Sequence, residues 1–239
     1  MLDLELTEEQ RLLRHSIREW GAREIAPRIH ELDRQHRFDP GILPKMASLG
    51  LLGISVPVEY GGAGMDYVSL GLACEELEYL DTSLRVIMSV HEGLNSLTIF
   101  AWGSEEQRKR YLAPQARGEK IGGYALTEPG AGSDVRGIQS VAVKKDGYWV
   151  LSGEKTWISL AQVADHFLVF AWSDQKKKKE RDVSGISAFM IEREFQGFSS
   201  GEIEEKWGIL AGNTGFFAMD EMEVPDENLI GREGEGFKI

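Results

Sequence analysis

The 239-residue sequence predicts an α+β fold, in which an N-terminal α-helical domain precedes a β domain of barrel or sandwich type. Apolar residues recur at helical spacing through the first half of the chain. In the second half, short apolar runs alternate with polar connections, and the change of period falls near Gly122. Because helices and strands occupy separate halves, the order argues against the alternating βαβ units of a Rossmann fold.

The helices are predicted from their start and stop signals. Thr7 with Gln10 three residues later has the pattern of a capping box, and we expect the helix that it opens to end at Pro27. Gly50 is a C-terminal signal for a second helix over residues 40–49. Further helices are predicted over residues 67–80, 84–102 and 104–112, after a glycine-rich loop at 56–66, and the last of them opens at Ser104 with Gln107 three residues later.

The strands are predicted from short runs of apolar and β-branched residues. Asp146-Gly147 lies between two such runs and predicts a tight hairpin. Lys176–Lys179 lies between two later runs, and we interpret it as a solvated loop tip rather than a phosphate-binding patch. The predicted strands are residues 124–128, 140–145, 148–152, 167–172, 186–191 and 216–224.

Charge and composition exclude some functions. The formal charge is −12, from 27 basic and 39 acidic residues, which argues against nucleic-acid or anionic-membrane partners. Cys74 is the sole cysteine, so we expect an inert thiol and a reducing compartment. No apolar run approaches the roughly 20 residues of a membrane span, and the first residues lack a secretory pattern. We expect a cytoplasmic protein, although a mature mitochondrial matrix protein has the same features.

Residues 124–134 form the segment with the most features of a ligand-binding site. A predicted strand breaks at Pro129 into a loop in which Gly130 and Gly132 allow close approach of the backbone to a ligand. The segment does not fit G-x-G-x-x-G, because Val135 occupies the sixth position. From these residues alone, a surface turn and a ligand site are about equally supported.

Trp157 and Ser159 form a second candidate. Two residues apart on a strand, they are expected to lie on the same face. A flat aromatic side chain beside a hydroxyl suits an isoalloxazine-like ring, whereas composition alone favours a half-buried tryptophan in a sheet.

Four segments in order resemble the acyl-CoA dehydrogenase family: residues 57–66, 124–134, 155–159 and 206–237. The resemblance covers essentially the whole chain. Members of this family have N-terminal helical, middle β and C-terminal helical domains, and they bind FAD between the last two. The resemblance therefore implies a helical domain at 1–121, a middle β domain at 122–231 and the start of a linker at 232–239, with the C-terminal helical bundle absent.

The resemblance also implies a cofactor site and a substrate contact. Ser133 would touch acyl-CoA as well as FAD, and Ser159 would bond near flavin N5, where the family commonly has Thr. The catalytic base is expected in the C-terminal domain, so no catalytic residue and no metal ligand is assigned in this chain. Glu128 is interpreted as a structural hydrogen-bond acceptor. The implied FAD-binding residues are Tyr124, Ala125, Leu126, Thr127, Gly132, Ser133, Trp157, Ile158 and Ser159.

The implied reaction is FAD-dependent α,β-dehydrogenation of an acyl-CoA thioester to a 2-enoyl-CoA. An electron-transfer flavoprotein is the implied acceptor, and a homotetramer is the implied assembly at full length. We expect this chain alone to bind FAD poorly and to be inactive. The alternatives are a catalytically silent flavin- or CoA-binding homologue and a related flavin oxidase or monooxygenase.

Substrate choice depends on Arg85. Glu78 and Arg85 match the placement in glutaryl-CoA dehydrogenases, where the arginine faces the distal carboxylate of the substrate. The slightly favoured alternative is that Arg85 pairs with Glu78 or with Asp81 on its own helical face. His91 follows on the same predicted helix and is expected to be a core or pocket-lining imidazole. The family often has Thr-Asn-Gly where this chain has residues 159–161, so the turn there is expected to differ.

Overall fold

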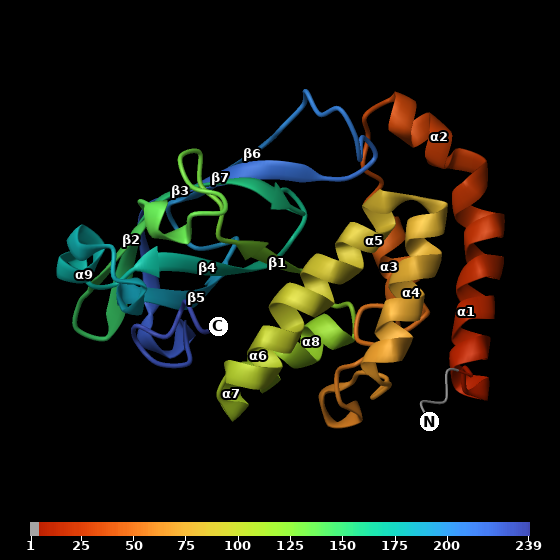
Figure 1. Cartoon of the computed structure of the whole chain (residues 1–239), viewed down its shortest axis with the longest axis horizontal. Coiled ribbons are helices and arrows are strands. Elements are labelled where there is room, and N and C mark those ends of the chain that lie inside the picture. Colours follow the sequence, from red (N-terminus) through yellow and green to blue (C-terminus); the bar gives the residue numbers. More distant parts are fainter. Residues whose placement is uncertain (1–4) are drawn as a thin grey trace.

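The computed structural model describes residues 5–239 and divides into a helical part and a sheet (Figure 1). Helices α1 to α8 come first in the chain and lie together on one side, and the strands follow with α9 among them and form the other side. This arrangement confirms the predicted fold class. Within the described residues, no helix combines the length and the apolar character that a bilayer crossing requires.

The helix signals in the sequence are confirmed at several ends. Thr7 and Ser104 each form a capping box with the glutamine three residues later. Gly50 follows α3 with a φ of 71°, the left-handed conformation that favours glycine. The helices of this part are α1 Glu8–Trp20, α2 Ala26–Arg34, α3 Ile42–Ser48, α4 Tyr67–Leu80, α5 Thr82–Met88, α6 Leu97–Trp102, α7 Glu105–Gln107 and α8 Ala113–Ala116.

Pro27 does not end the first helix, so that prediction was wrong. The residue lies in the first turn of α2, where a missing N–H is tolerated. The preceding stretch Gly21–Ile25 is π-helical and carries the chain from α1 into α2 without a break. Two further π-helical stretches, Ser89–Ser96 and Arg108–Leu112, join α5 to α6 and α7 to α8.

The strands form one connected sheet in the order β6-β7-β3-β2-β4-β5-β8, and β1 pairs with β4. The β1–β4 pair is parallel, whereas β3 and β7 form a long antiparallel pair in which Ser159 lies opposite Thr214. The β2–β3 hairpin at Asp146-Gly147 is confirmed. The strands are β1 Gly122–Ala125, β2 Val141–Lys144, β3 Tyr148–Ser159, β4 His166–Trp172, β5 Ile186–Glu192, β6 Phe198–Glu202, β7 Thr214–Pro225 and β8 Leu229–Ile230.

Three details of the sheet differ from the prediction. The strand expected over 124–128 ends at Ala125, because Glu128 enters a tight bridge with Ala131. The strand β6 was missed because its sequence, FSSGE, holds a single apolar residue. The lysine run lies on a short helix, α9 Gln175–Glu180, rather than on a loop, because the side chain of Asp174 caps its first turn.

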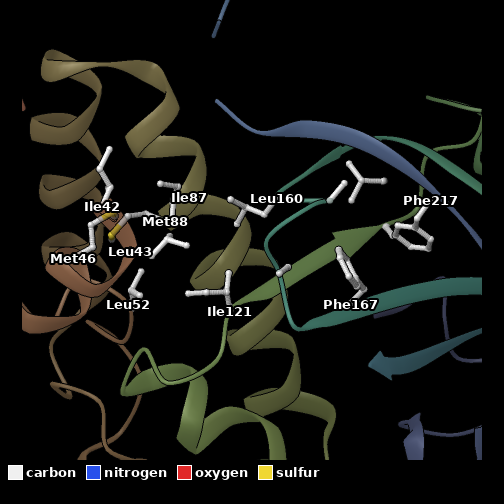
Figure 2. Packing of buried hydrophobic residues seen from close by; sticks show 14 of the residues in the cluster. Ile42, Leu43, Met46, Leu52, Ile87, Met88, Ile121, Leu160, Phe167 and Phe217 are labelled. Atoms are coloured by element: carbon white, nitrogen blue, oxygen red, sulfur yellow. The ribbon is translucent and has the colours of Figure 1, made fainter. Parts of the chain in front are cut away.

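One continuous buried cluster joins the helices to the sheet (Figure 2). Ile42 and Met46 of α3 and Ile87 of α5 contribute from the helical side. Phe167 of β4 and Phe217 of β7 contribute from the sheet. Because burial of apolar surface is the main driving force of folding, this shared cluster fixes the sheet against α3 and α5.

His91 and Cys74, both singled out in the sequence, have surroundings that favour the neutral side chain. His91 is fully buried: its Nδ1 accepts the backbone N–H of Gly122, and its Nε2 lies 3.1 Å from the carbonyl of Leu52. The proton is therefore on Nε2, and burial lowers the pKa of the imidazole to about 4. This confirms a core imidazole. Cys74 is partly buried, and burial raises the pKa of its thiol, which disfavours the reactive thiolate.

Candidate functional site

The two segments singled out by their chemistry lie side by side. The backbone N–H of Thr156 in β3 donates to the carbonyl oxygen of Thr127 over 3.0 Å. Leu126 and Thr127 are half-buried at this point. Trp157 is the next residue along β3, so the end of the 124–127 segment and the tryptophan strand share one edge of the site.

The buried side chain of Lys155 connects β3 to the segment that follows β1. The Nζ of Lys155 lies 2.7 Å from Oε1 of Glu128 and 2.7 Å from the carbonyl oxygen of Phe170. It also donates to the carbonyl oxygen of Leu126 over 3.1 Å. Burial lowers the pKa of the ammonium group to about 8, although the neighbouring carboxylate opposes this effect.

Glu128 has the structural role that we expected. Besides the bond from Lys155, its carboxylate accepts the backbone N–H of Ser140 over 3.1 Å and that of Gln139. Burial acts to raise the pKa of this carboxyl, but the charge and hydrogen bond of Lys155 outweigh it and lower the pKa below its usual value. A carboxylate held by three donors is poorly suited to accept a proton from a substrate.

Trp157 occupies an irregular position in β3. Its φ is 57°, and the pairing with β7 shifts register between Thr156 and Ile158. Its side chain is 58% exposed, whereas Ile158 is buried. Trp157 and Ser159 both line one surface groove, so they share a face as we expected. The reason is a bulge that directs the indole outward, not regular strand alternation.

The groove has a volume of ≈ 430 Å³. The two tryptophans on its walls come from different segments: Trp157 from β3 and Trp207 from the connection between β6 and β7. Trp207 is fully exposed. The complete lining is Trp157, Ser159, Glu205, Lys206, Trp207, Gly208, Ile209 and Thr214.

The connection that carries Trp207 is held by Lys206. Its Nζ donates to the carbonyl oxygens of Ile209, over 2.9 Å, and of Gly212. Burial lowers the pKa of this ammonium group. The sequence analysis included this stretch in the resembling segment 206–237 but assigned Trp207 no cofactor contact, because the connection has no periodic pattern that shows where the indole lies.

The turn after Ser159 contains a residue with a left-handed backbone. Leu160 adopts a φ of 63°, a conformation that asparagine tolerates better than leucine. Its backbone N–H donates to the carbonyl oxygen of Asn213, and the side chain of Asn213 accepts the N–H of Gln162. The turn is therefore held from across the sheet, and the side chain of Leu160 is buried in the core.

A smaller cavity of ≈ 40 Å³ adjoins the groove and lies between α5 and the sheet. Ser83, Val86 and Ile87 of α5 line it, and it shares Ser159 and other residues with the groove. Its lining combines apolar side chains, including Val86 and Ile87, with polar ones, including Ser83 and Asn213.

Arg85 is on the same helix but does not line this cavity. Its Nε donates to the carboxylate of Glu78 over 2.8 Å, and its Nη1 donates to Ser89. The hydrogen bond from Arg85 lowers the pKa of Glu78. The structure therefore has the favoured ion pair with Glu78.

The other residues predicted to contact FAD differ in how deeply they are buried. Tyr124 is half-buried with its ring tilted against Phe170, and Ala125 is fully buried. Gly132 and Ser133 are exposed beyond the Glu128–Ala131 bridge. They do not line the groove.

Two family models match the chain. The model of the acyl-CoA dehydrogenase N-terminal domain matches residues 7–119, and that of the acyl-CoA dehydrogenase middle domain matches residues 123–222. The chain belongs to the acyl-CoA dehydrogenase family. The resemblance inferred from the four sequence segments is thereby confirmed.

Individual acyl-CoA dehydrogenases are similar over the whole chain but extend beyond it. The short-chain specific acyl-CoA dehydrogenase of Clostridium acetobutylicum is 44% identical over 100% of this chain, which spans 62% of that relative. Butyryl-CoA dehydrogenase from Megasphaera elsdenii has a TM-score of 0.95 at 34% identity, over 99% of this chain and 62% of its own.

Two further solved structures contain ligands. Glutaryl-CoA dehydrogenase in complex with glutaryl-CoA has a TM-score of 0.93 at 35% identity, over 99% of this chain and 60% of its own. An acyl-CoA dehydrogenase from Bacillus anthracis, complexed with FAD, has a TM-score of 0.89 at 35% identity, over 100% of this chain and 40% of its own.

Proposed function

We propose that the protein contributes the helical and β portions of an FAD-dependent enzyme that converts an acyl-CoA thioester to a 2-enoyl-CoA. The observation that carries this proposal is the groove in which the outward indole of Trp157 lies next to the hydroxyl of Ser159, beside the 124–127 segment. The relatives of this chain are acyl-CoA dehydrogenases, and one of them has been solved with FAD.

The residues of the groove fit a flavin. A large indole is kept 58% exposed by a left-handed backbone at Trp157, an arrangement that exposes apolar surface and gains nothing in the protein alone. A flat ring covering this face would remove that surface from water. The hydroxyls of Ser159 and Thr214 supply donors at the same wall.

In this proposal the residues of the chain bind and orient the flavin and shield it from water. FAD, when bound, supplies the acceptor for the hydride that leaves the β-carbon of the acyl group. Trp157 would pack against the ring and keep water from it, and the hydroxyl of Ser159 would donate a hydrogen bond to a ring nitrogen. The backbone of the 124–127 segment and the exposed residues Gly132 and Ser133 form a second wall, with Ser133 also contacting the CoA thioester.

No catalytic base is assigned among residues 5–239. Glu128, the buried carboxylate next to the site, is already held by three donors. We propose that the base comes from the part of the relatives that this chain does not span, as do the remaining FAD contacts. The domain limits 1–121 and 122–231, an electron-transfer flavoprotein as acceptor, a homotetramer and a cytoplasmic or mitochondrial matrix location belong to the same proposal.

For the substrate we favour a short monocarboxylic acyl group. The cavity of ≈ 40 Å³ next to the groove is small and lined by Val86 and Ile87. Arg85 is engaged with Glu78 and does not line that cavity, so a dicarboxylic substrate lacks a free cation there.

The test uses the chain alone and the chain fused to the remaining C-terminal part of the Clostridium relative. We expect the chain alone to bind FAD weakly without turnover, and the fusion to hold FAD that bleaches anaerobically on addition of butyryl-CoA. A fusion that stays colourless at any FAD concentration would favour the silent homologue. Rapid hydrogen peroxide production in air would indicate an oxidase or monooxygenase instead.

A further inference from the structure

We propose that the buried Lys155–Glu128 ion pair is a positioning pair, which locks residues 126–131 onto β3 next to Trp157 and thereby holds the tryptophan that lines the cofactor groove. The flavin part of this inference rests on the proposed function. Neither residue lines the groove, so their effect on a ligand is indirect.

The contacts of the pair lie on both sides of the segment that they hold. Lys155 reaches the carbonyl oxygen of Leu126 before the turn and the carboxylate of Glu128 within it. Glu128 in turn accepts the backbone N–H groups of Gln139 and Ser140, which follow the glycine loop. The pair therefore joins the beginning and the end of this loop to the strand that carries Trp157.

The position of the pair inside the protein indicates a specific use. The side chain of Lys155 is completely buried, and that of Glu128 is 5% exposed. Removing two charges from water costs so much that a pair of apolar residues often gives equal or greater stability. A charged pair at this buried position has a use if its directional hydrogen bonds fix a backbone geometry that apolar side chains do not fix.

The hydrogen bond that should respond most to loss of the pair is the one from the N–H of Thr156 to the carbonyl oxygen of Thr127. Thr156 lies between Lys155 and Trp157, and Thr127 lies between Leu126 and Glu128. Without the pair, residues 126–131 lose two of their attachments to β3, and this amide is expected to exchange faster than the amides deeper in the β3–β7 pairing.

The decisive variant replaces both members by apolar residues, Lys155→Met with Glu128→Leu. Amide hydrogen exchange and thermal unfolding are measured on the purified chain, and FAD affinity, followed by flavin fluorescence, is measured on the fusion described above. We expect a thermal stability between those of the parent and the single variant Lys155→Met, because Glu128→Leu leaves the N–H groups of Gln139 and Ser140 without their acceptor. We also expect loss of protection at Thr156 with protection at Leu151 retained, and an FAD dissociation constant of the fusion raised by about tenfold. The single variant Lys155→Met is expected to unfold more easily, since it leaves a buried unpaired carboxylate.

The matched control is Lys144→Met, which breaks an exposed ion pair with Asp226 on the same sheet and should change none of the three readouts. Normal FAD affinity together with normal Thr156 protection in the double variant would overturn the positioning role. If the parent fusion does not bind FAD at all, the proposed function of the groove fails, while the exchange at Thr156 still decides whether the pair locks the segment.

Discussion

The backbone N–H of Thr156 donates to the carbonyl oxygen of Thr127 over 3.0 Å, and this bond joins the two halves of the candidate site. One half is the segment after β1, and the other is the irregular part of β3 that carries Trp157. Because the bond is between backbones, it places the two segments regardless of their side chains. The side chains then decide what the groove can hold.

Two substitutions separate the effect of the Trp157 backbone on stability from the effect of its side chain on FAD binding. At a φ of 57° we expect Trp157→Gly to be more stable than Trp157→Ala by about 1 kcal/mol, since a Cβ is strained in this conformation. Thermal unfolding of the two variants measures the difference. Both should bind FAD more weakly than the parent. If alanine proves the more stable replacement, the left-handed backbone at this position is wrong.

His91 should make the fold sensitive to mild acid. Its pKa in the folded chain is about 4, whereas an unfolded histidine titrates near 6.5. The unfolded state therefore binds more protons between these values, and folding stability falls as the pH drops from about 6.5 to 4, by about 3 kcal/mol in total.

The measurement is urea unfolding between pH 7 and the lowest pH at which the chain stays folded. His91→Gln retains a donor and an acceptor but cannot titrate, so its stability should be lower at pH 7 and should fall less steeply with acid. Equal pH slopes for the two proteins would show that His91 does not contribute to acid sensitivity. Other buried carboxyl groups cancel in this comparison.

Gly153 should tolerate no side chain. Its φ is 151°, and a Cβ there would come within 2.2 Å of the Oγ of Ser140. We expect Gly153→Ala to lower the free energy of unfolding by about 3 kcal/mol, through backbone strain and overpacking. Gly147→Ala is the matched control, because Gly147 has a φ of 84° but open space around it, and should cost only about 1 kcal/mol.

Urea unfolding of these variants gives the two costs directly. Adding Ser140→Gly to Gly153→Ala should recover the part of the loss that comes from the clash. A loss at Gly153 no larger than that at Gly147, or no recovery in the double variant, would contradict the close approach of Ser140.

Arg85 should be recognisable as the partner of Glu78. The hydrogen bond from Arg85 lowers the pKa of Glu78, so Arg85→Met should raise that pKa toward its ordinary value. An NMR titration of the Glu78 carboxyl in the parent and the variant measures the change. Asp66, which caps α4 and whose pKa is lowered by its hydrogen bonds from Ser69, is the internal reference and should titrate alike in both proteins. An unchanged Glu78 titration would leave Arg85 available for a substrate carboxylate.

The sequence was sufficient wherever local chemistry decides the structure. The capping boxes at Thr7 and Ser104, the helix Tyr67–Leu80 and the hairpin at Asp146-Gly147 depend on neighbouring residues, and all four are present. These elements carry their own signals of periodicity, capping and turn chemistry.

The sequence was insufficient where distant segments decide. The bulge at Trp157 arises from pairing with β7, and strand alternation alone could not show it. The same holds for the polar strand β6, which forms because β7 lies beside it, and for the groove wall at Trp207. The contact of Lys155 with Glu128 likewise required the fold, although both residues lay within segments already singled out.

The pairing of Ser159 with Thr214 also has a kinetic consequence. The chain between these residues contains β4, β5 and β6, so the end of β3 can meet the start of β7 only after a long loop has closed. Such pairings are slow, because the entropy of loop closure is lost before the contacts form. The groove should therefore appear late in refolding, and a fluorescence change at Trp157 would follow the formation of the helices.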